Sequence, residues 1–299
     1  MLTKYANNPI ITAANVPFRV NSIFNPGAVK YKNKYILLCR AEMPIGRSSF
    51  VIAESHNGID FTVQDKPCLT PEDHKTCFEY VEWGIEDARI TELEGTFYLT
   101  YTGYSKYMPV IILAETKNFK TFKIHGPISE PSNKDAALFP EKIKGFYWKL
   151  DRPSAENRRD IWINKSPDLI HWGTPKIVMQ PLPGSWLCDK IGSSSTPLKT
   201  KDGWLVLFHG VRSLGTAMMY KIGVMLLDLD KPWIVKGFSK DPLIAPDFMH
   251  ERIGDVGNVT FANGWVREKD GEIKIYYSGS DLNICLATTT EKYLLSLCK

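Results

Sequence analysis

Short runs of aromatic and β-branched residues, separated by clusters of Gly, Pro, Asn and Asp, recur along the whole chain. No segment carries the long 3.6-residue periodicity of an amphipathic helix, whereas apolar runs of roughly four to eight residues between turn signals are typical of strands. The pattern therefore predicts an all-β protein.

The strand-like runs come in pairs that repeat along the chain. The five first runs are residues 33–42, 95–103, 145–153, 202–211 and 271–279. Each is followed by a companion run, as in SFVIAESHNGIDF and DIWINKSPDLIHW. Units of roughly 40 to 70 residues that contain strands throughout are typical of β-propellers. We therefore predict one domain, residues 1–299, folded as a five-bladed β-propeller, with a large β-sandwich as the less periodic alternative.

The charge balance argues against a polyanionic partner. The formal net charge is +4, and the 37 basic residues are interspersed with 33 acidic ones. No basic run is present, so we expect no nucleic-acid binding. The N-terminus lacks the apolar core of a signal peptide, and no apolar stretch approaches the roughly 20 residues of a membrane helix. We expect a cytoplasmic protein without membrane association, and the sequence leaves a homo-oligomer open.

Cysteine and histidine spacing gives no sign of a metal or an organic cofactor. The six cysteines are scattered without a CxxC pair, and the six histidines form neither HxxxH nor HExxH. Phosphate-binding motifs of the GxGxxG and GxxxxGK[ST] types are absent as well. We expect buried thiols, no metal and no cofactor.

Polar residues gather where the first run of each pair ends. They are Arg40 and Glu42, Tyr104, Asp151 and Arg152, His209 and Arg212, and Asp281. For any single residue, a solvated strand end is the simpler explanation. Their repetition at matching positions predicts one funnel that contains carboxylates, guanidinium groups, an imidazole and aromatic rings, a mixture that suits a sugar.

The segment GIEDARI, residues 84–90, places two carboxylates just before a strand. One interpretation is a solvated loop in which Glu86 and Asp87 pair with Arg89. The other is a catalytic site, with Asp87 in a turn at the mouth of the funnel and Glu86 orienting Arg89. The residues alone leave both open.

Several motifs, taken in order, resemble those of the glycoside hydrolase family 130 mannoside phosphorylases. They are the NPG at 25–27, GIEDARI, KLDRPS, DKIGSSSTPLKTKDGW, LFHGV, YKIGVMLLDLDKP, GDVGNVTFANGWV and YYSGSDLNICLATT. The resemblance implies a five-bladed β-propeller that cleaves a β-mannosidic bond with inorganic phosphate. Inversion at the anomeric carbon would transfer the mannosyl group to phosphate as α-D-mannose 1-phosphate.

The resemblance also implies roles for individual residues. Asp87 matches the catalytic proton donor. The phosphate-binding positions are Arg152, Lys190 and His209, joined by Tyr220. The positions that line the mannosyl site are Asn25, Arg40, Arg89 and Asp281. The chain departs from the family pattern at Ala88 and Gly257, where Pro is usual, and in the Ser-rich loop after Lys190, which leaves linkage and acceptor open.

The chemistry of a phosphorylase agrees with this division. An inverting hydrolase needs one carboxyl group to protonate the leaving oxygen and a second to activate water. Phosphate is itself an anionic nucleophile, so cationic donors such as Arg152 and Lys190 replace the second carboxylate. The expected substrates are inorganic phosphate and a short β-mannoside such as β-1,2-mannobiose. The alternatives are a β-mannoside hydrolase, which would lack the cations, and a non-catalytic carbohydrate-binding propeller, which would lack the acid.

Overall fold

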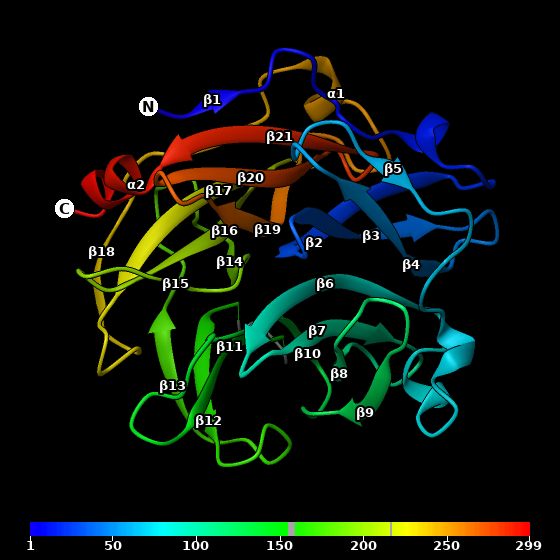
Figure 1. The fold of residues 1–299 in the computed structure, drawn as a ribbon. Coiled ribbons are helices and arrows are strands. Elements are labelled where there is room, and N and C mark those ends of the chain that lie inside the picture. The colour runs from blue at the N-terminus through cyan, green and yellow to red at the C-terminus, as the bar shows by residue number, and fades with distance from the viewer. Residues whose placement is uncertain (155–158, 216) are drawn as a thin grey trace.

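Strands are the main secondary structure in the computed structural model, which describes residues 1–154, 159–215 and 217–299 (Figure 1). The all-β prediction is confirmed. Helices are short: the 3-10 helices are η1 (Ala13–Asn15), η2 (Pro71–Asp73) and η3 (Phe78–Tyr80), and the α-helices are α1 (Met249–Arg252) and α2 (Glu291–Leu297). In the described part of the chain, no helix has the length and apolar character needed to cross a membrane.

The largest sheet has eight strands in two antiparallel groups. The first group is β2 (Ser22–Tyr31), β3 (Lys34–Glu42), β4 (Ser48–Ser55) and β5 (Thr62–Val63). The second is β6 (Gly84–Leu93), β7 (Thr96–Tyr104), β8 (Val110–Thr116) and β9 (Lys123–Pro127). A single parallel bridge between Ser48 and Gly84 joins the two groups, so by hydrogen bonding they form one sheet.

Three further antiparallel sheets follow. One contains β10 (Asn133–Leu138), β11 (Tyr147–Pro153), β12 (Ile161–Ser166) and β13 (Gly173–Met179). The next contains β14 (Lys190–Ser193), β15 (Leu198–Lys199), β16 (Trp204–Leu214), β17 (Ala217–Leu227) and β18 (Val235–Phe238). The last contains β19 (Thr260–Arg267), β20 (Glu272–Gly279), β21 (Asn283–Thr290) and the N-terminal β1 (Thr3–Lys4), which pairs with β21.

The strand pairs predicted from sequence are present, but each is preceded by a further strand. The predicted first runs correspond to β3, β7, β11, β16 and β20, and their companions to β4, β8, β12, β17 and β21. The strands β2, β6, β10, β14 and β19 come before them in each group. The sequence pattern did not reveal these preceding strands, because they carry polar residues and bulges that interrupt a strand-like pattern.

These preceding strands lie toward a common centre in Figure 1. Strand β2 contacts β6 and β19, and β10 contacts β6 and β14. In the described part of the chain, the hydrogen bonds define four sheets, and none of these closes on itself. The five-bladed arrangement therefore stays a prediction, whereas the central placement of these strands positions the site.

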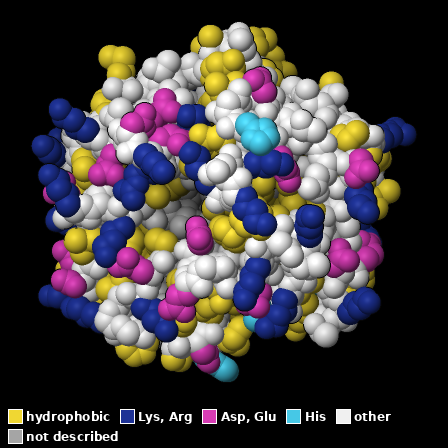
Figure 2. All heavy atoms as spheres, viewed as in Figure 1, with side chains coloured by type: hydrophobic (Ala, Val, Ile, Leu, Met, Phe, Trp, Pro, Cys, Tyr) yellow, Lys and Arg dark blue, Asp and Glu magenta, His cyan; other side chains and the backbone are white. Residues whose placement is uncertain are grey.

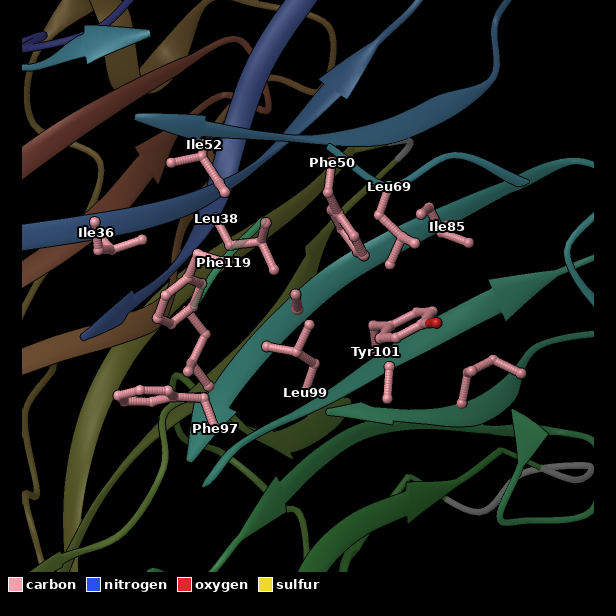
Figure 3. Packing of buried hydrophobic residues seen from close by; sticks show 14 of the residues in the cluster. Ile36, Leu38, Phe50, Ile52, Leu69, Ile85, Phe97, Leu99, Tyr101 and Phe119 are labelled. Carbon is pink, nitrogen blue, oxygen red and sulfur yellow. The ribbon is translucent and has the colours of Figure 1, made fainter. Parts of the chain in front are cut away.

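Apolar side chains fill the space between neighbouring groups of strands. Figure 3 shows Leu38 and Ile52 from β3 and β4 facing Leu99 and Tyr101 of β7. All four side chains are essentially inaccessible to solvent. Burying a side chain of this size stabilises the fold by roughly 1.5–3 kcal/mol, so these contacts hold the polar centre in a fixed geometry.

A polar turn follows the corresponding strand in four groups, namely β4, β8, β12 and β17. Asn57, Asn118, Asp168 and Asp228 each accept hydrogen bonds from the backbone N–H groups two and three residues later. Such turns satisfy backbone donors locally and end the strand at a defined residue. Their repetition shows that the groups are variants of one structural unit.

A β-bulge interrupts the strand that lies toward the common centre, called the central strand below, in four of the groups. The pairing register shifts after Phe24 in β2, after Glu86 in β6, after Lys134 in β10 and after Phe261 in β19. In the first three bulges the next residue has a positive φ: Asn25 at 45°, Asp87 at 57° and Asp135 at 61°. Asn and Asp tolerate this conformation better than other non-glycine residues. A bulge redirects a side chain, and here all three residues line one cavity.

Candidate active site

A cavity of about 210 Å³ lies where the central strands meet. Its wall contains four acidic and four basic side chains together with His209, polar groups and a short apolar edge. The lining residues are Asn25, Arg40, Glu86, Asp87, Lys134, Asp135, Arg152, Lys190, His209, Tyr220, Val256, Val259, Phe261 and Asp281. Eight of the nine residues predicted for the site are in this wall, and Arg89 is the exception.

Asp87 lies within strand β6 rather than in a turn before it, so that part of the prediction was wrong. Its Oδ1 accepts hydrogen bonds from Asn25 Nδ2 at 2.8 Å and from Arg40 Nη1 at 3.2 Å. No described residue hydrogen-bonds its other carboxyl oxygen. The side chain is 13% exposed, so the carboxyl group is held at one oxygen and available to a ligand at the other.

Glu86 does not orient Arg89, contrary to the prediction. It accepts from Arg40 Nη2 at 3.0 Å and from Lys134 Nζ at 3.2 Å. Burial opposes ionisation of this carboxyl group, but Arg40 and Lys134 outweigh it and lower its pKa. Glu86 is therefore an ionised counter-charge at neutral pH, which makes it a poor proton donor.

Asp281 follows β20 and faces the same cavity with a positive φ of 50°. Burial and the neighbouring Asp87 raise its pKa to about 7, against the opposing effect of Arg40. A carboxyl group beside another carboxylate gives up its proton less readily. Asp281 and Asp87 thus form an interacting pair of carboxyl groups in the wall of the cavity.

The residues predicted to bind phosphate converge as expected. Lys190 Nζ donates to Tyr220 Oη at 2.6 Å, and burial together with Arg152 lowers the pKa of Lys190 to about 8. His209 is 1% exposed, and burial lowers its pKa to about 3 in spite of Asp135. Arg152 and Lys190 are therefore the cations of this set at neutral pH, while the imidazole is neutral.

Arg89 lies beneath the cavity rather than in its wall. The residue is 1% exposed and its Nε donates to the backbone oxygen of Ser194 at 2.9 Å. Nη1 donates to the backbone oxygen of Asp87 at 2.8 Å, and Nη2 donates to Asp135 Oδ1 at 3.3 Å. Arg89 is consequently a buried link between two bulges and is absent from the cavity wall.

Lys134 and Asp135 were missed by the sequence reasoning. A signal was present, because KDA at 134–136 repeats the EDA at 86–88. Both tripeptides form the bulge of a central strand. Among the described residues, no group of three or more His, Cys, Asp or Glu side chains is placed to hold a metal ion.

The chain resembles known proteins over nearly its full length. The model of the glycoside hydrolase 130 family, described as beta-1,4-mannooligosaccharide phosphorylase, matches residues 3–299. The beta-1,2-mannobiose phosphorylase of Listeria innocua is 31% identical, covering 94% of each chain. The beta-1,4-mannooligosaccharide phosphorylase of Ruminococcus albus is 33% identical, covering 97% of this chain and 88% of that protein.

The fold agrees with this relationship. The structure of the Listeria innocua beta-1,2-mannobiose phosphorylase in complex with beta-1,2-mannobiose matches with a TM-score of 0.91 and 29% identity over 99% of both chains. A match of the family model over residues 3–299 is far more specific than any single motif. The chain therefore belongs to glycoside hydrolase family 130.

Proposed function

We propose that the protein is a glycoside phosphorylase that cleaves a β-mannoside with inorganic phosphate. The observation that carries this proposal is that the carboxyl group of Asp87 lines the same cavity as the cations Arg152 and Lys190. A nucleophile that is already an anion needs cationic partners rather than a second carboxylate base. The related proteins named as mannoside phosphorylases support the same reaction class.

The proposed reaction begins with a proton on Asp87. Asp87 transfers this proton to the glycosidic oxygen, directly or through a sugar hydroxyl, as the bond from that oxygen to the anomeric carbon breaks. An oxygen of hydrogen phosphate attacks the same carbon from the opposite face, which inverts it and gives α-D-mannose 1-phosphate. The proton released from the phosphate balances the one lost by Asp87, so the acid is restored at the end of the cycle.

The cationic side of the cavity supports the nucleophile. Arg152 can donate to phosphate from its guanidinium group, and Lys190 adds a compact charge. The hydroxyl of Tyr220 accepts from Lys190 and holds that ammonium group in place. Neutral His209 can donate one hydrogen bond without adding charge.

The other side of the cavity suits sugar hydroxyls. We assign Asn25, Arg40 and Asp281 to the mannosyl group because they surround Asp87 and line the cavity. Arg89 acts from beneath by holding the backbone of Asp87. The substrate we favour is β-1,2-mannobiose or a related β-mannosyl disaccharide, and the relatives carry both β-1,2 and β-1,4 names.

Incubation with β-mannobioses of defined linkage, with and without phosphate, tests the proposal. We expect α-mannose 1-phosphate, detected by phosphorus NMR, only when phosphate is present. Cleavage at the same rate without phosphate would identify a hydrolase instead. Binding of a mannoside without cleavage under either condition would identify a carbohydrate-binding protein.

We also infer that the strands form a five-bladed propeller. Five antiparallel groups surround one centre, and the pairing of β1 with β21 ties the N-terminal segment to the last group. The single bridge between Ser48 and Gly84 is the contact that merges two groups into one sheet. A crystal structure showing five separate four-stranded blades would establish this architecture, and a sandwich of facing sheets would exclude it.

A further inference from the structure

A buried carboxylate, Asp135, lies among the cationic groups of the cavity. Its side chain is 5% exposed. Oδ2 accepts from Arg152 Nε at 2.7 Å and lies 3.6 Å from His209 Nε2, and Oδ1 accepts from Arg89 Nη2 at 3.3 Å. Burial opposes its ionisation, but the guanidinium groups of Arg152 and Arg89 outweigh burial and hold the pKa of Asp135 well below its usual range. The group is therefore an anion inside the proposed phosphate site.

The backbone around Asp135 allows its carboxylate to approach His209. The residue sits in the bulge of β10, and the hydroxyl of Ser193 donates to its carbonyl oxygen. Strand β14 passes so closely that a Cβ on Gly192 would lie 2.4 Å from Asp135 Oδ2 and 2.4 Å from His209 Cε1. Only a residue without a side chain leaves room for the carboxylate and the imidazole to meet.

A carboxylate repels phosphate. The contacts that Asp135 makes with its partners explain why a carboxylate is present here. Asp135 holds Nε of Arg152, and Ser154 Oγ accepts from Nη1 at 2.9 Å. Among the described residues, none accepts a hydrogen bond from Nη2. The guanidinium group is thus fixed at two nitrogens and left open at the third, where an anion in the cavity can bind.

We propose that Asp135 is a positioning residue for phosphorolysis, which holds Arg152 and the His209 ring in the orientation that receives phosphate. Through Arg89, the same carboxylate is linked to the bulge that carries Asp87. One buried group thereby connects the acid side of the cavity with the phosphate side. The inference rests on the proposed function.

Asp135→Asn tests the role with little change of shape. We expect the KM for phosphate to rise about tenfold, the typical effect of weakening one charge-assisted contact, while the KM for the mannoside changes less than about twofold. A lower KM for phosphate would show that Asp135 only repels the anion. That result, or an unchanged KM, would overturn the proposal.

A double-mutant cycle separates positioning from a general structural role. If Asp135 acts through Arg152, then Asp135→Asn should change the KM for phosphate less than about twofold in an Arg152→Ala background. Fully additive effects of the two changes would overturn the inference.

Asp151→Asn is a matched control. The strand-end pattern predicted Asp151 for the funnel, but the structure places it in the wall of a different cavity. There it is a buried carboxylate paired with a cation, Lys149. The KM for phosphate should stay within about twofold of the parent value even if the melting temperature falls. A rise equal to that of Asp135→Asn would show that loss of any buried ion pair is enough.

Two additional measurements keep the inference testable. If Asp135→Asn does not fold, Gly192→Ala provides a second route, because its methyl group would press on Asp135 and His209 and should also raise the KM for phosphate. If the parent protein yields no mannose phosphate from any mannoside, the proposed function fails on its own. In that case calorimetric titration with inorganic phosphate still tests the role of Asp135. Equal affinity of the parent and the Asp135→Asn variant for phosphate would overturn the inference.

Discussion

Asp87 and Asp135 occupy the same kind of backbone position in neighbouring groups of strands, yet their surroundings differ completely. Both are bulge residues with a positive φ in a central strand. The carboxyl group of Asp87 accepts hydrogen bonds from Asn25 and one guanidinium group, that of Arg40, and the side chain is 13% exposed. Asp135 is 5% exposed and lies within 3.6 Å of two guanidinium groups and an imidazole.

The difference shows that the bulge supplies the direction of the side chain, whereas the neighbouring strands decide its chemistry. A carboxyl group with one oxygen open can exchange a proton with a ligand. A carboxylate surrounded by donors cannot, but it can hold those donors in place. The repeated unit has thus placed the proposed acid in one strand and a counter-ion in another.

The largest expected effect comes from removing the proton of Asp87. Asp87→Asn should lower turnover of an unactivated mannobiose by about 10² to 10⁴-fold, the usual contribution of general acid catalysis, while the protein stays folded. Synthesis from α-mannose 1-phosphate should fail as well, because the same group must then act as the base. Steady-state rates in both directions check this.

Glu86→Gln is the control for that change, since Glu86 lies beside Asp87 but is held by Arg40 and Lys134. It should reduce turnover far less. If Glu86→Gln proves the more damaging variant, the acid is not Asp87 and the comparison of the two bulges breaks down.

The next effect concerns the cations around phosphate. Arg152→Ala or Lys190→Ala should raise the KM for phosphate roughly ten- to hundred-fold, because a charge-assisted contact is typically worth about 1.5–3 kcal/mol. The KM for the mannoside should change much less. Kinetics with phosphate and sugar varied independently measure the two separately, and equal changes in both constants would place these residues outside the phosphate site.

A smaller effect should follow from the pKa of Lys190, which burial and Arg152 lower to about 8. The ammonium group is charged below that pH and loses its charge above it. We therefore expect the KM for phosphate to rise about tenfold as pH increases from 7 to 9. Lys190→Arg keeps its charge throughout this range, so its KM for phosphate should vary less with pH; an identical pH profile would contradict the assignment.

The smallest effect is on stability and involves Asp281, whose pKa is raised from 3.8 to about 7. Between these values the folded state keeps a proton that the unfolded state loses, so this contribution to stability is full below pH 4 and disappears as pH rises through 7. Asp281→Asn carries no such charge. At pH 8 the melting temperature of the variant should be higher than that of the parent. The difference should be about 2–4 °C for each kcal/mol of stability that the parent loses when Asp281 ionises.

Thermal melts at pH 4, 6 and 8 would measure the Asp281 effect. The difference between variant and parent should grow from pH 4 to pH 8. A constant difference would show that Asp281 does not face Asp87 as a charged neighbour in the folded protein.

Much of the site was predicted because short motifs of the chain resemble those of glycoside hydrolase family 130. Asp87, Arg152, Lys190 and His209 all line the cavity in which the motifs placed them. The hydrophobic pattern also located the strand pairs correctly, since alternation and turn residues act within a few neighbouring positions. Neither pattern revealed the preceding central strands, whose polar bulges look like turns in sequence.

The sequence by itself determined an all-β chain, the strand pairs and the residue types that a phosphorylase needs. Only the tertiary structure decided which charges meet. Glu86 pairs with Arg40 rather than with Arg89 three positions away, and Arg89 turns beneath the cavity to reach Asp135. The physical reason is that an ion pair depends on distance in space, and these partners are 46 residues apart in the chain.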